Sequence, residues 1–170
     1  MGTKVHQEKA DKETPARCAV LTVTDSRTPE TDTSGRAAAE LFRRAGHTVV
    51  LHEIIPNVEK KLAAALVTAL NGADVVVTIG GTGISRKDLS ADVVRGFVYK
   101  ELPGFGELFR AFSMKDIGTA TILSRALLGV TKESKIVLAL PGSESAVRLG
   151  LEGILLPQLK HLLWELRRYS

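Results

Sequence analysis

Short apolar segments alternate with longer amphipathic segments along most of the chain. Four of the short segments are rich in β-branched and aliphatic residues and are typical of strands: Cys18 to Thr24, His47 to Ile55, Ala73 to Ile79 and Lys135 to Leu140. The third is apolar almost throughout, which predicts a strand buried on both faces. The first strand therefore lies near the start of the chain, and both faces of the sheet are expected to be covered.

The segments between these strands have helical spacing. Asp32-Thr33-Ser34-Gly35 predicts a capped helix start, and Gly46 predicts its end. The apolar residues of this helix, Ala38, Leu41, Phe42 and Ala45, fall on one face. A second helix follows Pro56-Asn57, runs through Leu70 and ends at Asn71-Gly72.

The second half of the chain is less regular. Helical stretches are expected at Ser90 to Val98 and Pro103 to Phe112, whereas Thr119 to Val130 is compatible with an edge strand or a hairpin. From Glu144 to Tyr169 the pattern predicts a long helix that is interrupted or kinked at Pro157.

Strands that alternate with helices through short connections are typical of right-handed βαβ units. The expected fold class is therefore α/β, with a mostly parallel sheet covered by helices. Residues 1–16 interleave lysine with acidic residues and predict a disordered arm, which leaves 17–170 as a single domain.

Composition narrows the function classes. The chain is 44% hydrophobic, 25% charged and 5% aromatic, with a formal charge of +4, and it has no long basic run. We therefore expect no nucleic-acid platform, whereas a small anionic substrate suits the charge. The chain has neither a signal peptide nor the roughly 18-residue apolar run of a membrane span, so a cytoplasmic protein is expected.

The only cysteine, Cys18, excludes an internal disulfide and fits a reducing compartment. Its place in an apolar run favours a core side chain over a nucleophile.

Three of the predicted strands end in polar or glycine-rich segments: Thr24-Asp25-Ser26, Gly80-Gly81-Thr82-Gly83 and Pro141-Gly142-Ser143. Ligands of open parallel sheets bind at these carboxyl ends. The glycine segment would let backbone N–H groups approach a phosphate, but a plain tight turn explains it equally well. It matches neither the dinucleotide fingerprint nor the Walker A pattern.

Two carboxylates lie near these strand ends. Asp88 follows Gly83 by five residues, and it either works beside a phosphate through Mg²⁺ or caps the helix that begins near Leu89; spacing alone favours the cap. Asp25 likewise has two possible roles: its side chain contacts the ligand or forms a turn.

Further candidates are less specific. The segment from Glu101 to Glu107 carries Phe105, which could stack on a planar ring of a ligand or pack in the core. Ser124-Arg125 could bind an anion, although a solvated or ion-paired arginine is commoner. The four histidines have no metal-ligand spacing.

Six motifs taken together resemble the MoaB/Mog family of molybdenum cofactor biosynthesis, over residues 17–168, and look closer to its MoaB branch. The motifs are Thr22 to Arg27, Asp32 to Gly35, Gly80 to Gly83 with Asp88, Gly104 to Arg110, Leu123 to Ala126 and Leu140 to Ser143.

The resemblance implies a three-layer α/β/α sandwich, assembled as a homotrimer or homohexamer, that binds molybdopterin at the strand ends. Active members transfer AMP from Mg²⁺-ATP to the pterin phosphate and release pyrophosphate, and other molybdenum-cofactor enzymes are expected partners. The resemblance implies that Asp88 is the catalytic aspartate, linked to Mg²⁺. The residues expected to hold or border the ligand are Asp25, Ser26, Gly80, Gly81, Thr82, Gly83, Ser124, Arg125, Pro141, Gly142 and Ser143, with Asn57, Glu101 and Glu107 as further candidates.

One position departs from the family pattern. Active Mog-type relatives carry aspartate after the proline that ends the second strand, whereas this chain has Asn57 after Pro56. The neutral amide has no carboxylate with which to bind a metal ion, so two hypotheses stand: an adenylyltransferase, and a non-catalytic molybdopterin-binding or scaffolding protein. A generic flavodoxin-like domain lacks any supporting fingerprint.

The final helix is rich in apolar residues, which favours a symmetric oligomer over burial within one chain. These residues are Leu155, Leu156, Leu159, Leu162, Leu163 and Trp164.

Overall fold

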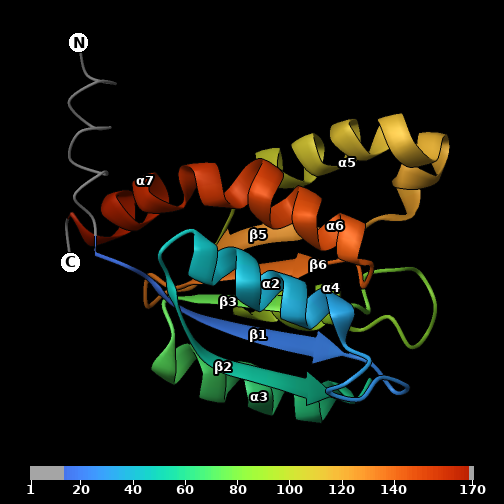
Figure 1. Cartoon of the computed structure of the whole chain (residues 1–170), viewed down its shortest axis with the longest axis horizontal. Helices are drawn as coiled ribbons and strands as arrows, with labels where there is room; N and C mark the ends of the chain where they lie inside the picture. The colour runs from blue at the N-terminus through green and yellow to red at the C-terminus, as the bar shows by residue number, and fades with distance from the viewer. Residues whose placement is uncertain (1–13, 169–170) are drawn as a thin grey trace.

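A computed structural model describes residues 14–168 and shows a six-stranded sheet in the order β2-β1-β3-β6-β5-β4 (Figure 1). The strands are β1 (Arg17–Val23), β2 (Thr48–Ile55), β3 (Val75–Ile79), β4 (Lys100–Glu101), β5 (Leu127–Val130) and β6 (Ile136–Leu140). Strands β1, β2, β3 and β6 are parallel, whereas β5 runs antiparallel to β6 and β4 antiparallel to β5. The expected α/β class with an antiparallel edge is confirmed.

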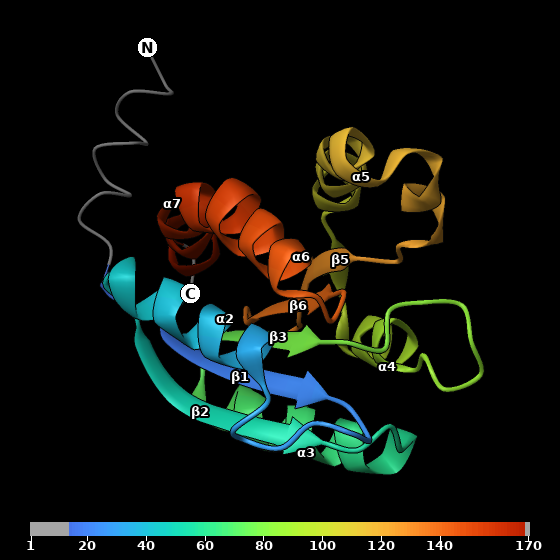
Figure 2. The same cartoon turned by 45° about the vertical axis from the view of Figure 1, so that its right-hand side comes forward.

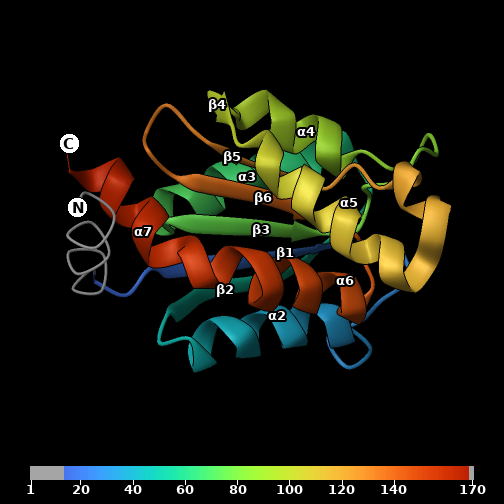
Figure 3. The same cartoon turned by 90° about the horizontal axis from the view of Figure 1, so that it is seen from above.

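Helices cover both faces of the sheet, which makes three layers (Figures 1 and 3). One face is covered by α2 (Thr33–Arg44), α5 (Pro103–Ile117) and the C-terminal helices; the other is covered by α3 (Glu59–Gly72) and α4 (Ser90–Phe97). Each face of the sheet has its own hydrophobic core, and successive strand residues point to opposite faces. Val20 and Val77 pack on the α2 side, and Leu21 and Val76 pack on the α3 side.

The strongest local signals of the sequence are confirmed. Asp32 is the N-cap of α2, where its carboxylate accepts the Gly35 N–H at 2.9 Å. Gly46 follows the helix with a φ of 85°, a conformation that glycine adopts without strain. All five residues of β3 are buried, as their continuous apolar run predicts.

The ambiguous segment 119–130 contains two elements. A 3-10 helix, η1 (Gly118–Leu123), comes first, and β5 then forms a hairpin with β6 through a turn in which the Ser134 N–H donates to the Thr131 carbonyl. The two-residue edge strand β4 was not expected. It is held by pairing with β5, because the flanking Tyr99 and Leu102 N–H groups donate to β5 carbonyls.

The long C-terminal helix is interrupted, although before Pro157. It consists of α6 (Glu144–Arg148), a π-helical segment η2 (Leu149–Leu155) and α7 (Leu156–Arg167), with Pro157 in the first turn of α7. Proline has no N–H and its ring would meet the carbonyl four residues earlier, so the wider π turns lie just upstream of it.

The apolar residues of α7 and of the last η2 position, Leu155, are covered in part by the chain itself. Leu155, Leu159 and Leu163 are buried in the core on that side of the sheet, whereas Leu156, Leu162 and Trp164 are half-buried. More than half of the exposed large apolar side chains lie on α5 and η1 instead, among them Leu108, Met114, Ile117, Ile122 and Leu123, whereas Ile84 and Tyr99 are exposed in other segments. Intramolecular burial therefore accounts for three of the six apolar residues expected on the final helix.

Most of the predicted N-terminal arm lies outside the described residues, but its last residue does not behave as an arm. Ala16 is fully buried and its N–H donates to His47 Nδ1 at 3.1 Å. The packed part of the chain therefore includes Ala16. Among residues 14–168, no helix has the length and apolarity needed to cross a membrane.

Candidate functional site

A cavity of about 370 Å³ lies at the carboxyl ends of β3 and β6. Figure 2 shows the loop after β3, the start of α6 and η1 at this same end of the sheet. Predicted site residues from three separate segments line it: Gly81, Thr82, Gly83 and Asp88; Ser124; and Pro141, Gly142 and Ser143. The fold therefore brings the two strand exits together as the parallel topology predicts.

The two glycines directly after β3 are required by their positive φ angles and by close contacts with Val23 and Ser90. Gly80 and Gly81 have φ values of 98° and 65°. A Cβ on Gly80 would lie 2.5 Å from the Val23 carbonyl oxygen, and one on Gly81 would lie 2.5 Å from Ser90 Oγ. Gly80 itself does not line the cavity; it lets the β3 and β1 exits approach each other.

The carbonyl groups of this loop are held by donors of the protein. The Gly81 carbonyl accepts the Ser90 N–H at 2.9 Å, and the Thr82 carbonyl accepts the Arg125 N–H at 3.3 Å. The Gly83 carbonyl accepts Arg125 Nε at 2.8 Å. Three successive carbonyls are thus directed to internal partners, which favours presentation of the opposite, N–H side of the loop to an anion.

Asp88 lies in the cavity wall and does not cap the next helix. Its Oδ2 accepts the Ser85 N–H at 2.8 Å, while α4 has Leu89 at its N-cap with no side-chain cap. The predicted cap is therefore wrong, because the carboxylate turns back to close the loop 83–88. Hydrogen bonds from Ser85, with smaller contributions from Gly83 and Arg125, lower the pKa of Asp88, so the group is anionic.

Arg125 braces the glycine loop and does not line the cavity. Its Nη2 donates to the Asp88 carbonyl at 2.7 Å, and its Nη1 contacts both oxygens of Asp92 at 2.8 Å. Together with the Gly83 contact, these bonds occupy the guanidinium group. Arg125 is therefore an ion-paired arginine, which was the commoner of the two alternatives, and only its neighbour Ser124 reaches the cavity.

Asp25, Ser26 and Asn57 lie outside the lining of this cavity. Asp25 Oδ1 accepts the Asn57 N–H at 2.8 Å, and its Oδ2 lies 3.9 Å from Lys87 Nζ. Hydrogen bonding from Asn57 is the main cause that lowers the pKa of Asp25. The Ser26 N–H donates to Thr24 Oγ1 in a local turn. The local turn is thus made by Thr24, whereas the Asp25 carboxylate joins the loop after β1 to Asn57, 32 residues further along the chain.

The segment from Glu101 to Glu107 does not line the cavity. Glu101 is in β4, 3.9 Å from Arg95, and Glu107 is exposed on α5. Phe105 is buried against Phe109, with ring centroids 6.1 Å apart. Phe105 is thus a core residue, and Phe109, two residues beyond this segment, lines the cavity.

Sequence reasoning missed the α5 wall of the cavity. Phe109, Ser113 and Asp116 all line it from one helix face. Their spacing of four and three residues was the available signal, but it does not show that this face meets the strand exits.

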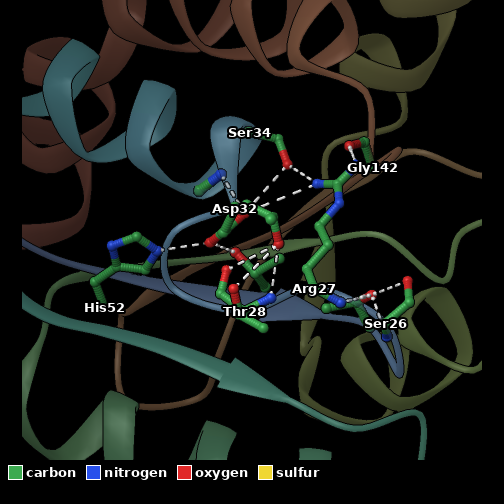
Figure 4. A network of polar contacts seen from close by, with 11 residues as sticks. Ser26, Arg27, Thr28, Asp32, Ser34, His52 and Gly142 are labelled. Carbon is green, nitrogen blue, oxygen red and sulfur yellow. Dashed lines mark hydrogen bonds and ion pairs between the residues drawn. The ribbon is translucent and has the colours of Figure 1, made fainter.

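A second missed feature is a buried polar network beside the cavity (Figure 4). The fully buried Asp32 carboxylate accepts Thr22 Oγ1 at 2.8 Å and contacts His52 Nε2 at 2.9 Å. Arg27 bonds Ser34 Oγ through Nη1, which lies 3.8 Å from Asp32 Oδ1, and donates from Nη2 to the Gly142 carbonyl at 3.0 Å. The network therefore reaches a residue that lines the cavity.

The site offers few ligands for a metal ion. The described residues contain no group of three or more histidine, cysteine or acidic side chains placed to bind one. Asp88 and Asp116 are the carboxylates in the cavity lining. Mg²⁺ in proteins is commonly held by one or two carboxylates together with substrate phosphates and water, and this donor set fits that mode.

Comparisons with known proteins agree on one family. Residues 19–161 match the family model described as "Probable molybdopterin binding domain". "Molybdenum cofactor biosynthesis protein B" of Bacillus anthracis is 42% identical over 171 residues, covering 99% of each chain. A crystal structure of a molybdenum cofactor biosynthesis protein B is 41% identical with a TM-score of 0.86, covering 92% of this chain and 98% of that one. The tungsten cofactor synthesizing protein MoaB of Pyrococcus furiosus is 37% identical with a TM-score of 0.82, covering 90% and 98%.

Proposed function

This chain belongs to the molybdopterin-binding domain family of molybdenum cofactor biosynthesis, and on that premise we propose that it binds molybdopterin in the cavity at β3 and β6 and adenylylates its phosphate. The observation that carries the proposal is one cavity shared by the glycine loop, the Pro141–Ser143 loop and an anionic Asp88.

The cavity suits a phosphorylated ring compound. Its volume of about 370 Å³ is within the usual range for small-molecule sites. The glycine loop, with its carbonyls held by Ser90 and Arg125, receives the phosphate. Phe109, Ile117 and Leu123 supply apolar wall for the rest of the molecule.

Asp88 is the proposed catalytic residue. An anionic carboxylate beside a phosphate loop is unfavourable unless a cation lies between them. Asp88, with Asp116 as the second carboxylate of the lining, would hold Mg²⁺ together with phosphate oxygens of ATP. When bound, the ion supplies charge neutralisation for nucleotidyl transfer.

The protein's own contribution is alignment. A pterin phosphate oxygen attacks the α-phosphorus of ATP, a new P–O bond forms, and the bond to pyrophosphate breaks with pyrophosphate as leaving group. The loops after β3 and β6 orient the attacking phosphate, and Arg125 keeps the first loop in place through Gly83 and Asp88.

The second candidate is a molybdopterin-binding protein of the same pathway without transferase activity. Asn57 favours it, because this residue is neutral and donates to Asp25 outside the cavity lining. In this alternative the protein passes bound molybdopterin to other molybdenum-cofactor enzymes.

We also propose assembly as a homotrimer or homohexamer. Exposed apolar side chains gather on α5 and η1, and an apolar groove of about 380 Å³ lies between α5 and α7, lined by Leu102, Leu108 and Leu162 among others. Light scattering at micromolar concentration checks the assembly, and a sharp monomer mass would contradict it.

The experiment for the function uses purified protein, molybdopterin and Mg²⁺-ATP. We expect molybdopterin binding, release of pyrophosphate and formation of adenylylated molybdopterin, with transfer lost when Mg²⁺ is chelated. Binding without transfer, in both the wild type and Asn57→Asp, would replace the enzyme by the non-catalytic binding protein. Absence of binding would refute both candidates.

A further inference from the structure

Arg27 connects two loops that come from distant parts of the sequence. It lies in the loop between β1 and α2, and its Nη2 donates to the carbonyl of Gly142, 115 residues further along the chain, at 3.0 Å. Figure 4 shows its guanidinium group between Asp32 and Ser34 on one side and Gly142 on the other. Arg27 lines a different surface hollow, with Arg36 and His52, and is absent from the lining of the molybdopterin cavity.

The residue that Arg27 contacts forms part of the ligand cavity. Gly142 lines it between Pro141 and Ser143. A Cβ on Gly142 would lie 3.4 Å from the Cα of Gly80, so the loops after β3 and β6 pack backbone against backbone. A displacement of the Gly142 carbonyl therefore changes one wall of the cavity and its contact with the other.

The guanidinium group of Arg27 is itself held in place by Asp32 and Ser34. Asp32 is fully buried and its two oxygens accept from Gly35, Thr22 and His52, which leaves the carboxylate with little freedom to rotate. Arg27 Nη1 lies 3.8 Å from this carboxylate and also bonds Ser34 Oγ. A fixed negative charge and a hydroxyl thus orient the fork whose other arm reaches Gly142.

We propose that Arg27 is a positioning residue for ligand binding: anchored by Asp32 and Ser34, it holds the Gly142 carbonyl and so sets the Pro141–Ser143 wall of the cavity. This inference rests on the proposed function, since the wall matters only if the cavity takes molybdopterin. Arg27 acts through Gly142 and does not contact the ligand.

The test compares Arg27→Met, which keeps the aliphatic stem, and Arg27→Lys, which keeps the charge but loses the fork. Arg44→Met is the matched control, because Arg44 is an exposed arginine on α2 with a single ion pair to Glu40 at 3.9 Å. Two quantities are measured well below the unfolding temperature: amide NMR shifts of Gly142 and Ser143 without ligand, and the dissociation constant for molybdopterin.

We expect Arg27→Met to shift both amide signals and to raise the dissociation constant at least about tenfold, which is the size of one lost charge-assisted hydrogen bond. Arg27→Lys should fall between Arg27→Met and wild type, because one ammonium group cannot span Ser34 and Gly142 as the fork does. Arg44→Met should match wild type in both measurements.

Two results would overturn the inference. One is unchanged amide signals in Arg27→Met; the other is shifted signals with unchanged molybdopterin affinity, which would leave Arg27 a purely structural residue. If wild type itself binds no molybdopterin, the proposed function fails and the role in binding fails with it. The amide signals then still decide whether Arg27 holds the loop.

Discussion

Replacing Arg125 by methionine removes the guanidinium group that holds the glycine loop, while it keeps most of the aliphatic stem. The substitution deletes donors to the Gly83 and Asp88 carbonyls, at 2.8 and 2.7 Å, and the ion pair to Asp92 at 2.8 Å. Because two of the three partners are backbone groups of the loop 83–88, we expect the loop to loosen and the chain to lose stability.

The size of the effect follows from the exposure of the partners. Hydrogen bonds to a charged donor contribute about 1.5 to 3 kcal/mol each, and the lower end applies here because the Arg125 side chain is 31% exposed. The Asp92 carboxylate is 59% exposed, so its ion pair adds less than about 1 kcal/mol. The total is about 3 kcal/mol, which corresponds to a fall of roughly 6 to 12 °C in Tm for a domain of this size.

Thermal unfolding followed by circular dichroism measures this loss, with Asp92→Asn as the control. Asp92→Asn removes the ion pair and leaves both carbonyl contacts in place, so its Tm should fall by no more than about 4 °C. If Arg125→Met and Asp92→Asn have the same Tm, the carbonyl contacts do not hold the loop and the reasoning is wrong.

Three further predictions concern stability and reactivity. Gly80→Ala should lower the free energy of unfolding by roughly 3 kcal/mol, because its Cβ would lie 2.5 Å from the Val23 carbonyl oxygen at a φ of 98°. Gly46→Ala, where φ is 85° and the space is open, should lower it by only about 1 kcal/mol. Equal losses in urea unfolding would contradict this prediction. Burial pushes the pKa of Asp32 up, but its hydrogen bonds outweigh burial and lower the pKa below the ordinary 3.8, so its contribution to stability is complete above that pH and disappears as the pH falls through the folded-state pKa. Asp32→Asn should therefore flatten the acid side of the unfolding free energy against pH, and an unchanged slope would count against this assignment. Burial raises the pKa of the Cys18 thiol to about 12, so iodoacetamide should label it only after unfolding in urea, and rapid labelling of the native protein would be inconsistent with the structure.

Local patterns predicted the central sheet because local residues determine it. The run from Val75 to Ile79 has no polar side chain except Thr78, and burial on both faces is the only environment that suits it. In contrast, Lys100 and Glu101 of β4 are exposed and charged, and their strand conformation comes from pairing with β5. Such pairing leaves no periodic signal in the strand itself.

The candidate site, like the sheet, was predicted only in part. The glycine loop, Asp88 and the Pro141–Ser143 loop could be located because parallel strands end at one edge of the sheet. The loop contacts of Arg27 and Arg125 could not be predicted, since each guanidinium reaches a carbonyl in a loop far away in sequence. The orientation of Asp88 was missed because a carboxylate just before a helix has two local partners to choose from.

The most direct test of the proposed function measures molybdopterin affinity and AMP transfer in wild type and Asp88→Asn at fixed Mg²⁺. We expect Asp88→Asn to abolish transfer while the pterin still binds, because a metal-linked carboxylate stabilises charge in the transition state more than in the ground state. Asp88→Asn that transfers AMP at the wild-type rate would contradict the assignment of Asp88 as the catalytic carboxylate.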